Sequence, residues 1–132
     1  MADCIIADGY GHPSAINEAK GKEESRDWHA ISDKYIERYD NVFCFANDIG
    51  ARFLLPAYMI WIIKNASTSE TCTTDFVLYF LDRVDKGKSF ADLLTNDQKG
   101  AVRDFLSLMK NQMIMHCDSK AAESALKKWK CV

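Results

Sequence analysis

Apolar residues recur along most of this chain at the three- and four-residue spacing that places side chains on one face of an α-helix. The clearest case begins at residue 28, and its apolar positions are Trp28, Ile31, Tyr35, Ile36 and Tyr39. Charged residues occupy the opposite face of the same segment. We therefore predict a helix over residues 28–39, with Ser25 or Asp27 as its N-cap.

A proline interrupts the most apolar part of the chain. Residues 53–63 carry no charge and lie between Arg52 and Lys64, with Pro56 inside the run. Because proline fits the first turn of a helix but kinks its interior, the pattern allows either one kinked helix over residues 48–64 or a new helix that begins at Pro56. The run is shorter than the about 20 apolar residues that span a membrane, so we interpret it as a buried core helix.

The C-terminal half predicts three further helices. The first covers residues 75–83, the second begins after Thr95, and the third begins after Asp118 or Ser119. Thr95 and Gln98 have the spacing of a capping box, in which the side chain of each residue accepts a hydrogen bond from the backbone N–H of the other. The start of the second helix is therefore the best-defined boundary in the sequence.

No segment shows a convincing alternation of apolar and polar residues, which argues against a β-sheet. The short apolar segment 42–45 is compatible with a buried turn or with a brief strand. We predict an all-α fold, a single compact domain of four to six helices. Residues 1–26 lack periodicity and contain several glycines, so we predict a flexible N-terminal arm there and a helical domain over residues 27–132.

Composition narrows the class of protein without identifying an activity. The chain has 132 residues, of which 48% are hydrophobic, and 17 basic against 19 acidic side chains give a net charge of −2. These values fit an ordinary soluble domain that is long enough to bury a core. The slightly acidic balance gives no electrostatic reason to expect nucleic acid as a partner, because that binding depends on neutralising phosphates.

The N-terminus and the cysteines indicate a cytoplasmic protein. The first residues are acidic and their apolar run is short, whereas an export signal begins with basic residues and continues with a longer apolar run. The five cysteines are odd in number, widely spaced, and include no C-x-x-C pair. We therefore expect free thiols, a cytoplasmic location and no interaction with a membrane.

Candidate catalytic groups are sparse. The sequence contains no zinc-binding pattern, no glycine-rich phosphate loop and no nucleophile elbow, so we predict neither a metal nor a cofactor. His29 could pair with Asp33 for acid–base chemistry, although such helical pairs are more often exposed surface pairs. His116 and Cys117 are adjacent, and adjacent helical side chains point in different directions. We assign no catalytic residue.

Arg52 is the strongest candidate for a binding residue. It adjoins the most apolar segment, and because an isolated buried charge is costly its guanidinium must reach water or a partner. It could bind an anion or a partner's carboxylate in bidentate fashion, or it could clamp a carboxylate or carbonyl groups within the fold. Tyr58 and Trp61 are near neighbours on the same predicted helix, and each carries a polar atom for a binding groove or for one hydrogen bond in the core. Arg52, Tyr58 and Trp61 are the candidate ligand- or partner-binding residues.

Several segments in a fixed order resemble a family of small bacterial proteins known only as a domain of unknown function. They are an RF-x-LPAYM segment over residues 52–59, a Q-x-x-A-V-x-x-FL segment over residues 98–106, an AL-x-x-W ending over residues 125–129, and Trp28 near the start of the helical part. The resemblance covers about residues 20–130 and implies a helical protein of a bacterial cytosol. It implies no activity and transfers no catalytic residue.

Three classes of function compete on this sequence. The lack of catalytic groups together with the surplus of aromatic residues favours a non-enzymatic protein-binding module, of the kind that neutralises a partner or confers immunity. A small enzyme or anion-binding protein would use Arg52 to hold its substrate, with His29 or an aspartate as base. A structural homo-oligomer would form through an exposed apolar patch. We predict the protein-binding module.

Overall fold

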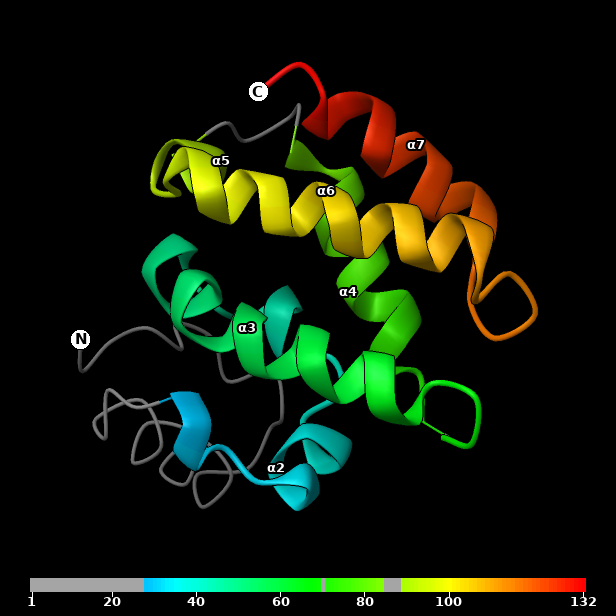
Figure 1. The fold of residues 1–132 in the computed structure, drawn as a ribbon. Coiled ribbons are helices and arrows are strands. Elements are labelled where there is room, and N and C mark those ends of the chain that lie inside the picture. The colour runs from blue at the N-terminus through cyan, green and yellow to red at the C-terminus, as the bar shows by residue number, and fades with distance from the viewer. Residues whose placement is uncertain (1–27, 70, 85–88) are drawn as a thin grey trace.

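The computed structural model describes residues 28–69, 71–84 and 89–132. In these residues the chain forms six α-helices and two 3-10 turns, with no β-strand among its elements, which confirms the predicted all-α fold (Figure 1). In chain order the elements are η1 (Trp28–Ala30), α2 (Asp33–Arg38), η2 (Val42–Cys44), α3 (Asp48–Asn65), α4 (Thr73–Asp82), α5 (Ser89–Asp92), α6 (Asn96–Asn111) and α7 (Ser119–Trp129). The arm predicted over residues 1–26, and Ser25 and Asp27 as N-caps, lie outside the described residues.

The first predicted helix is divided in two, and its boundary differs from the prediction. The α-helix begins at Asp33, not at Trp28, because Ser32 is extended and its Oγ accepts a hydrogen bond from the N–H of Tyr35 at 3.1 Å. The preceding residues form the separate turn η1. Ile31, Tyr35 and the other apolar residues of this face are buried as predicted, but Trp28 is only half-buried.

Pro56 lies in the interior of a single helix. Of the two alternatives for this segment, the single helix is therefore correct, and the helix that begins at Pro56 is not. Asn47 is the N-cap of α3, and its Oδ1 accepts a hydrogen bond from the N–H of Gly50 at 2.9 Å. Because proline has no N–H, the carbonyl of Arg52 loses the donor that an i+4 residue normally provides. The apolar segment before α3 is a buried 3-10 turn and not a strand.

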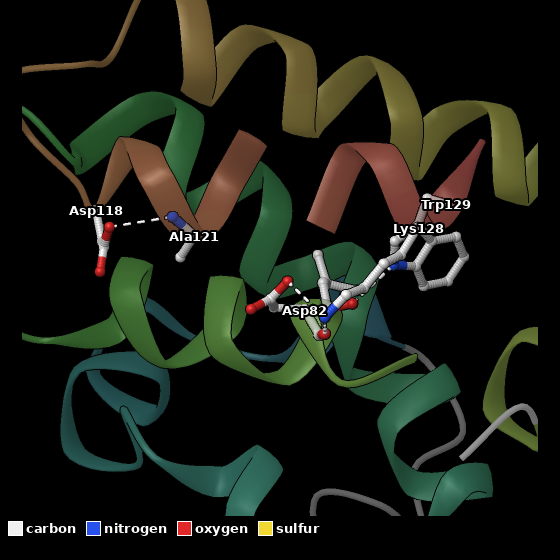
Figure 2. Close-up of polar contacts among 6 residues, drawn as sticks. Asp82, Asp118, Ala121, Lys128 and Trp129 are labelled. Atoms are coloured by element: carbon white, nitrogen blue, oxygen red, sulfur yellow. Dashed lines mark hydrogen bonds and ion pairs between the residues drawn. The ribbon is translucent and has the colours of Figure 1, made fainter. Parts of the chain in front are cut away.

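Side chains near the ends of α6 and α7 determine where these helices begin. The capping box before α6 is formed as predicted: Thr95 Oγ1 accepts from the N–H of Gln98 at 3.1 Å, and Gln98 Oε1 accepts from the N–H of Thr95 at 2.9 Å. Of the two N-caps considered for α7, the structure selects Asp118, whose Oδ1 accepts from the N–H of Ala121 at 3.1 Å (Figure 2).

The capping box gives a direct test of this boundary. Replacing Thr95 by alanine removes one of its two hydrogen bonds and is expected to lower the free energy of unfolding by about 1 kcal/mol. Urea denaturation of the parent and the variant measures the difference. Ser67→Ala is the control, because Ser67 is exposed in a loop and its hydroxyl caps no helix of the described structure, and we expect almost no change there. Equal stability of parent and Thr95→Ala would contradict the assigned boundary.

The helices form two layers with α4 between them. Helices α6 and α7 lie side by side and antiparallel in one layer, and α3 with η1 and α2 forms the other (Figure 1). Helix α4 packs closely against α7 and also contacts α3. The core therefore lies around α4, and the fully buried side chains come from all of the longer helices.

The end of α7 is fastened to the end of α4 by two side chains (Figure 2). Trp129 is fully buried, and its Nε1 donates to the carbonyl of Leu81 at 2.9 Å. Lys128 Nζ donates to the carbonyl of Asp82 at 2.7 Å and lies 3.2 Å from Asp82 Oδ1. A cation at this position suits the negative end of the α4 dipole. The Lys128 ammonium group is therefore held by contacts within the fold.

A second set of polar contacts joins the start of α7 to α4. The N–H of Asp118 donates to Asp75 Oδ1 at 2.9 Å, and the hydroxyl of Tyr79 donates to Asp118 Oδ2 at 3.1 Å. Asp118 thus caps α7 and accepts from α4 at the same time. With Lys128 near the other end, the two helices are held in register at both ends.

Candidate functional site

The side chain of Arg52 is exposed on α3 beside a shallow hollow between α3 and α6. We call this hollow the Arg52 groove, and it has a volume of about 110 Å³. The residues that line it are Arg52, Leu55, Pro56, Met59, Leu94, Gln98, Ala101 and Val102. Most of these side chains are apolar, so the groove is an apolar surface with a cationic group at its edge.

The groove exists because small or rigid residues face each other across two helices. Pro56 on α3 and Ala101 on α6 project little, whereas Leu55 and Val102 are buried and belong to the core beneath. Leu94 adds an apolar wall from the link between α5 and α6. The two segments that carry the family resemblance, RF-x-LPAYM and Q-x-x-A-V, therefore meet at this surface.

The groove has the chemistry of a binding surface. Arg52 is the one ionisable side chain among the described residues that line the groove, and its guanidinium makes no hydrogen bond or ion pair with another described residue. The Arg52 carbonyl lacks its usual helical donor because of Pro56. The Arg52 guanidinium thus provides donors at one edge, but none of the described lining groups could serve as a general acid or base near neutral pH.

Tyr58, the second predicted binding residue, faces the interior. Its side chain is 0% exposed, and its hydroxyl donates to the carbonyl of Tyr39 at 2.7 Å. Its ring meets Phe43 edge-on, with the centroids 5.0 Å apart. Tyr58 therefore contributes no surface to the Arg52 groove, and it holds α3 against the end of α2 and against η2.

Trp61, the third predicted binding residue, lies on the opposite side of α3 from Arg52. Nine residues at 100° per residue place the two side chains about 180° apart around the helix. Trp61 is almost fully buried, and its ring lines two other pockets, one polar and one of mixed character. The structure therefore does not bring Arg52, Tyr58 and Trp61 together.

The mixed pocket is lined by both His29 and Asp33. It has a volume of about 310 Å³, and its further polar residue is Lys64. The imidazole of His29 is stacked on Trp28, with ring centroids 3.7 Å apart. Since Arg52 lines a different pocket, the arrangement of Arg52 with His29 as base, considered from the sequence, is not assembled here.

Sequence reasoning missed the residues that complete the Arg52 groove. Leu94 and Ala101 have no local signal, because an apolar residue near a helix start resembles any other. Gln98 was identified as a capping residue, and it also lines the groove. Arg52 and Gln98 each begin a segment that carries the family resemblance, and this was the one sequence signal that could have suggested a common surface.

Two ionisable side chains of the described residues have raised pKa values. Burial raises the pKa of the Cys117 thiol, and the Sγ lies 3.3 Å from the carbonyl of Met113, so the unreactive thiol form is favoured. Donation to Asp118 raises the pKa of the Tyr79 hydroxyl. Within the part of the chain that the structure describes, no three His, Cys, Asp or Glu residues are grouped to hold a metal ion.

Comparison with known proteins assigns the chain to a family. No helix in the described residues combines the length and the apolar character needed to cross a membrane. No match was found among curated proteins or among solved structures. A family model described as a family of unknown function, DUF6714, matches residues 2–130, and so extends further toward the N-terminus than the resemblance noted from the sequence. The chain therefore belongs to the family of unknown function DUF6714.

Proposed function

We propose that this protein is a non-enzymatic binding module whose Arg52 groove receives an apolar side chain of a partner protein together with a neighbouring carboxylate. The observation that carries this proposal is an exposed arginine, without a partner among the described residues, at the edge of an apolar groove. Three properties of the groove support it, namely its size, its surroundings and its charge.

Size favours a protein partner over a small molecule. Pockets for small ligands have volumes of roughly 300–1,000 Å³, whereas the Arg52 groove has about 110 Å³. A space of this size suits a single aliphatic side chain presented by a larger surface. Such an anchor in a shallow pocket, with an arginine beside it, is typical of the residues that dominate protein–protein binding.

The surroundings of the groove extend its apolar surface. Ile49 and Ile63 on α3 are each about half exposed, and Leu93 is exposed beside Leu94. Ile49 lies three residues before Arg52, and Ile63 lies four residues after Met59, so both are neighbours of the groove on the helix surface. An exposed apolar area with a polar edge is the usual character of an interaction surface.

Charge defines the second requirement for the partner. A guanidinium binds a carboxylate through two parallel N–H···O bonds, and no acidic residue is among the described residues that line the groove. The groove therefore fits a segment in which an aspartate or glutamate adjoins a leucine-like residue.

We further propose that the protein acts in a bacterial cytosol and neutralises its partner, as immunity proteins do. The described cysteines Cys44, Cys72, Cys117 and Cys131 are free thiols, and persistent free thiols are typical of a reducing compartment. The net charge of −2 does not favour nucleic acid as the partner. A gene for a toxin beside the coding sequence would support the neutralising role.

Two substitutions test the groove. Arg52→Ala removes the guanidinium and is expected to weaken a purified partner's affinity about tenfold, which is the effect of losing a charged hydrogen bond. Ala101→Trp fills the groove from an exposed position and is expected to abolish binding. Isothermal titration calorimetry with a partner captured from a native lysate measures both effects.

Arg83→Ala is the matched control, because Arg83 is an exposed arginine outside the groove, and it should leave the affinity unchanged. Both test positions are exposed, so their thermal midpoints should match the parent. A set of captured proteins that is the same for parent, Arg52→Ala and Ala101→Trp would refute the proposal. Light scattering that shows self-association abolished by Ala101→Trp would assign the surface to a homo-oligomer instead.

A further inference from the structure

The side of α3 that faces away from the core carries a continuous row of apolar residues. Ile49, Ile60 and Ile63 are each between 41% and 51% exposed. Phe53 and Pro56 lie between Ile49 and Ile60 on the same side and are partly exposed. The five residues follow one another at spacings of four, three, four and three, which is the alternation of the a and d positions in a coiled-coil seam. We call these five residues the α3 stripe.

Two cations border the α3 stripe, one on each side. Arg52 precedes Phe53 and Lys64 follows Ile63, so the two cations occupy a g position and an e position, which lie on opposite sides of a coiled-coil seam. Both side chains are exposed, and neither makes a hydrogen bond or an ion pair with another described residue. After Asp48, α3 contains no acidic residue. The stripe is therefore an apolar surface with a positive charge on each flank.

We infer that the partner segment received by the Arg52 groove is an amphipathic α-helix that lies along the α3 stripe, with a carboxylate on each flank of its own apolar side. This inference rests on the proposed function, and it adds the secondary structure of the partner segment and a second acidic contact, at Lys64. Pro56 belongs to both the groove and the stripe, and Arg52 borders both. One segment can therefore fill the groove and cover the stripe.

The length and the repeat of the stripe favour a helix over an extended segment. From Ile49 to Ile63 the stripe advances about 21 Å, at about 1.5 Å per residue, so successive side chains are about 5 Å apart along the axis. A partner helix has the same advance from one seam position to the next, and its side chains fit between those of α3. In an extended segment, side chains on one face are about 6.6 Å apart, so the match is lost within a few residues.

Charge favours an acidic partner helix over a second copy of this chain. In a coiled-coil pair, residues at the e and g positions of one helix meet e and g residues of the other helix. Along the stripe these positions are held by Gly50, Arg52, Ala57, Met59 and Lys64, and none of them is acidic. A second α3 would therefore offer no counter-ion to Arg52 or Lys64 in either orientation, whereas an acidic helix pairs with both cations.

Two synthetic peptides of about 21 residues test the inference. Both peptides carry leucine at every a and d position. One carries glutamate at every e and g position, and the other carries lysine there. Fluorescence anisotropy measures the binding of each peptide to the full chain, and circular dichroism measures the helix that forms on mixing. We expect the acidic peptide to bind saturably and to gain helix, and the basic peptide not to bind, because its charges repel those that flank the stripe.

Two substitutions act on the stripe without touching the Arg52 groove, because neither residue lines it. Lys64→Glu replaces an attraction by a repulsion and should weaken the acidic peptide about tenfold. Ile60→Glu places a charge in the seam and should abolish binding. Lys120→Glu on α7 and Ile114→Glu in the loop before it are the matched controls and should leave the affinity unchanged. All four positions are exposed, so the thermal midpoints of the variants should equal that of the parent.

The variants also separate this inference from the proposed function. Loss of a captured partner in Arg52→Ala and Ala101→Trp, but not in Ile60→Glu and Lys64→Glu, would support the groove and overturn the helix. Loss of the acidic peptide in Ile60→Glu, but not in Ala101→Trp, would support the helix on α3 and refute the groove. Equal affinity of the two peptides, or no saturable binding of the acidic peptide, would overturn the inference.

Discussion

Replacing Trp129 by alanine is expected to lower the free energy of unfolding by about 3–5 kcal/mol, the range for deleting a large buried aromatic side chain. Trp129 is 0% exposed, and its ring meets Phe90 edge-on at a centroid distance of 6.1 Å. The substitution also leaves the carbonyl of Leu81 without the donor that lies 2.9 Å away. Such a loss is a large part of the ~5–15 kcal/mol that stabilises a typical domain.

Trp28→Ala is the matched control for this prediction. Patterning alone assigns Trp28 to a buried helical face, but in the structure it lies in η1 and is only half-buried. We expect a loss of about 1 kcal/mol there, since burial is partial. Urea denaturation measures both losses. A change in the midpoint at an unchanged dependence on urea concentration reports stability, whereas a changed dependence reports an altered unfolded state. Equal losses at Trp28 and Trp129 would contradict the difference in burial.

The difference between these two tryptophans shows which parts of the fold were predictable from sequence. The helix that contains Trp129 begins at a capping residue, Asp118, and repeats its apolar positions without interruption. The segment that contains Trp28 has an equally regular pattern, but Ser32 captures a backbone N–H and starts a new helix there. A short polar side chain can thus override the apolar pattern, because it supplies a hydrogen bond that the pattern does not record.

Helix α3 shows why the candidate site was only partly predictable. Its residues are apolar on nearly all sides, so the spacing of apolar residues does not say which face is buried. Arg52 was predicted to reach water or a partner, because burying its charge is costly, and in the structure its side chain is exposed. Tyr58 and Trp61 could not be placed in this way, since each suits both a core and a binding surface.

The groove itself depends on tertiary packing. Pro56 and Ala101 are more than forty residues apart in sequence, and neither residue alone indicates a hollow. They face each other because α6 packs over the core beside α3, an arrangement that follows from how all of the apolar faces are buried together (Figure 1). The presence of a helix and its first residue depend on local sequence and can be predicted from it. A concave surface depends on how two helices pack, which the local sequence does not give.

Tyr58→Ala is expected to destabilise the protein by about 3–5 kcal/mol, as for other buried aromatic side chains. The ring of Tyr58 is fully buried against Phe43, and its hydroxyl donates to the carbonyl of Tyr39 at 2.7 Å. Tyr58→Phe keeps the ring and removes the hydroxyl, so it should cost only about 1 kcal/mol, because the N–H of Val42 also donates to that carbonyl at 3.2 Å.

Urea denaturation of these variants and of Tyr79→Phe tests the role of Tyr58. Tyr79 is the control, because its hydroxyl also donates to an oxygen, that of Asp118, but its side chain is exposed. We expect a near-neutral effect there. If Tyr58→Ala were as stable as the parent yet lost binding to a partner, Tyr58 would be a surface contact. A large loss of stability means instead that Tyr58 holds α3 on the core through Phe43 and the Tyr39 carbonyl.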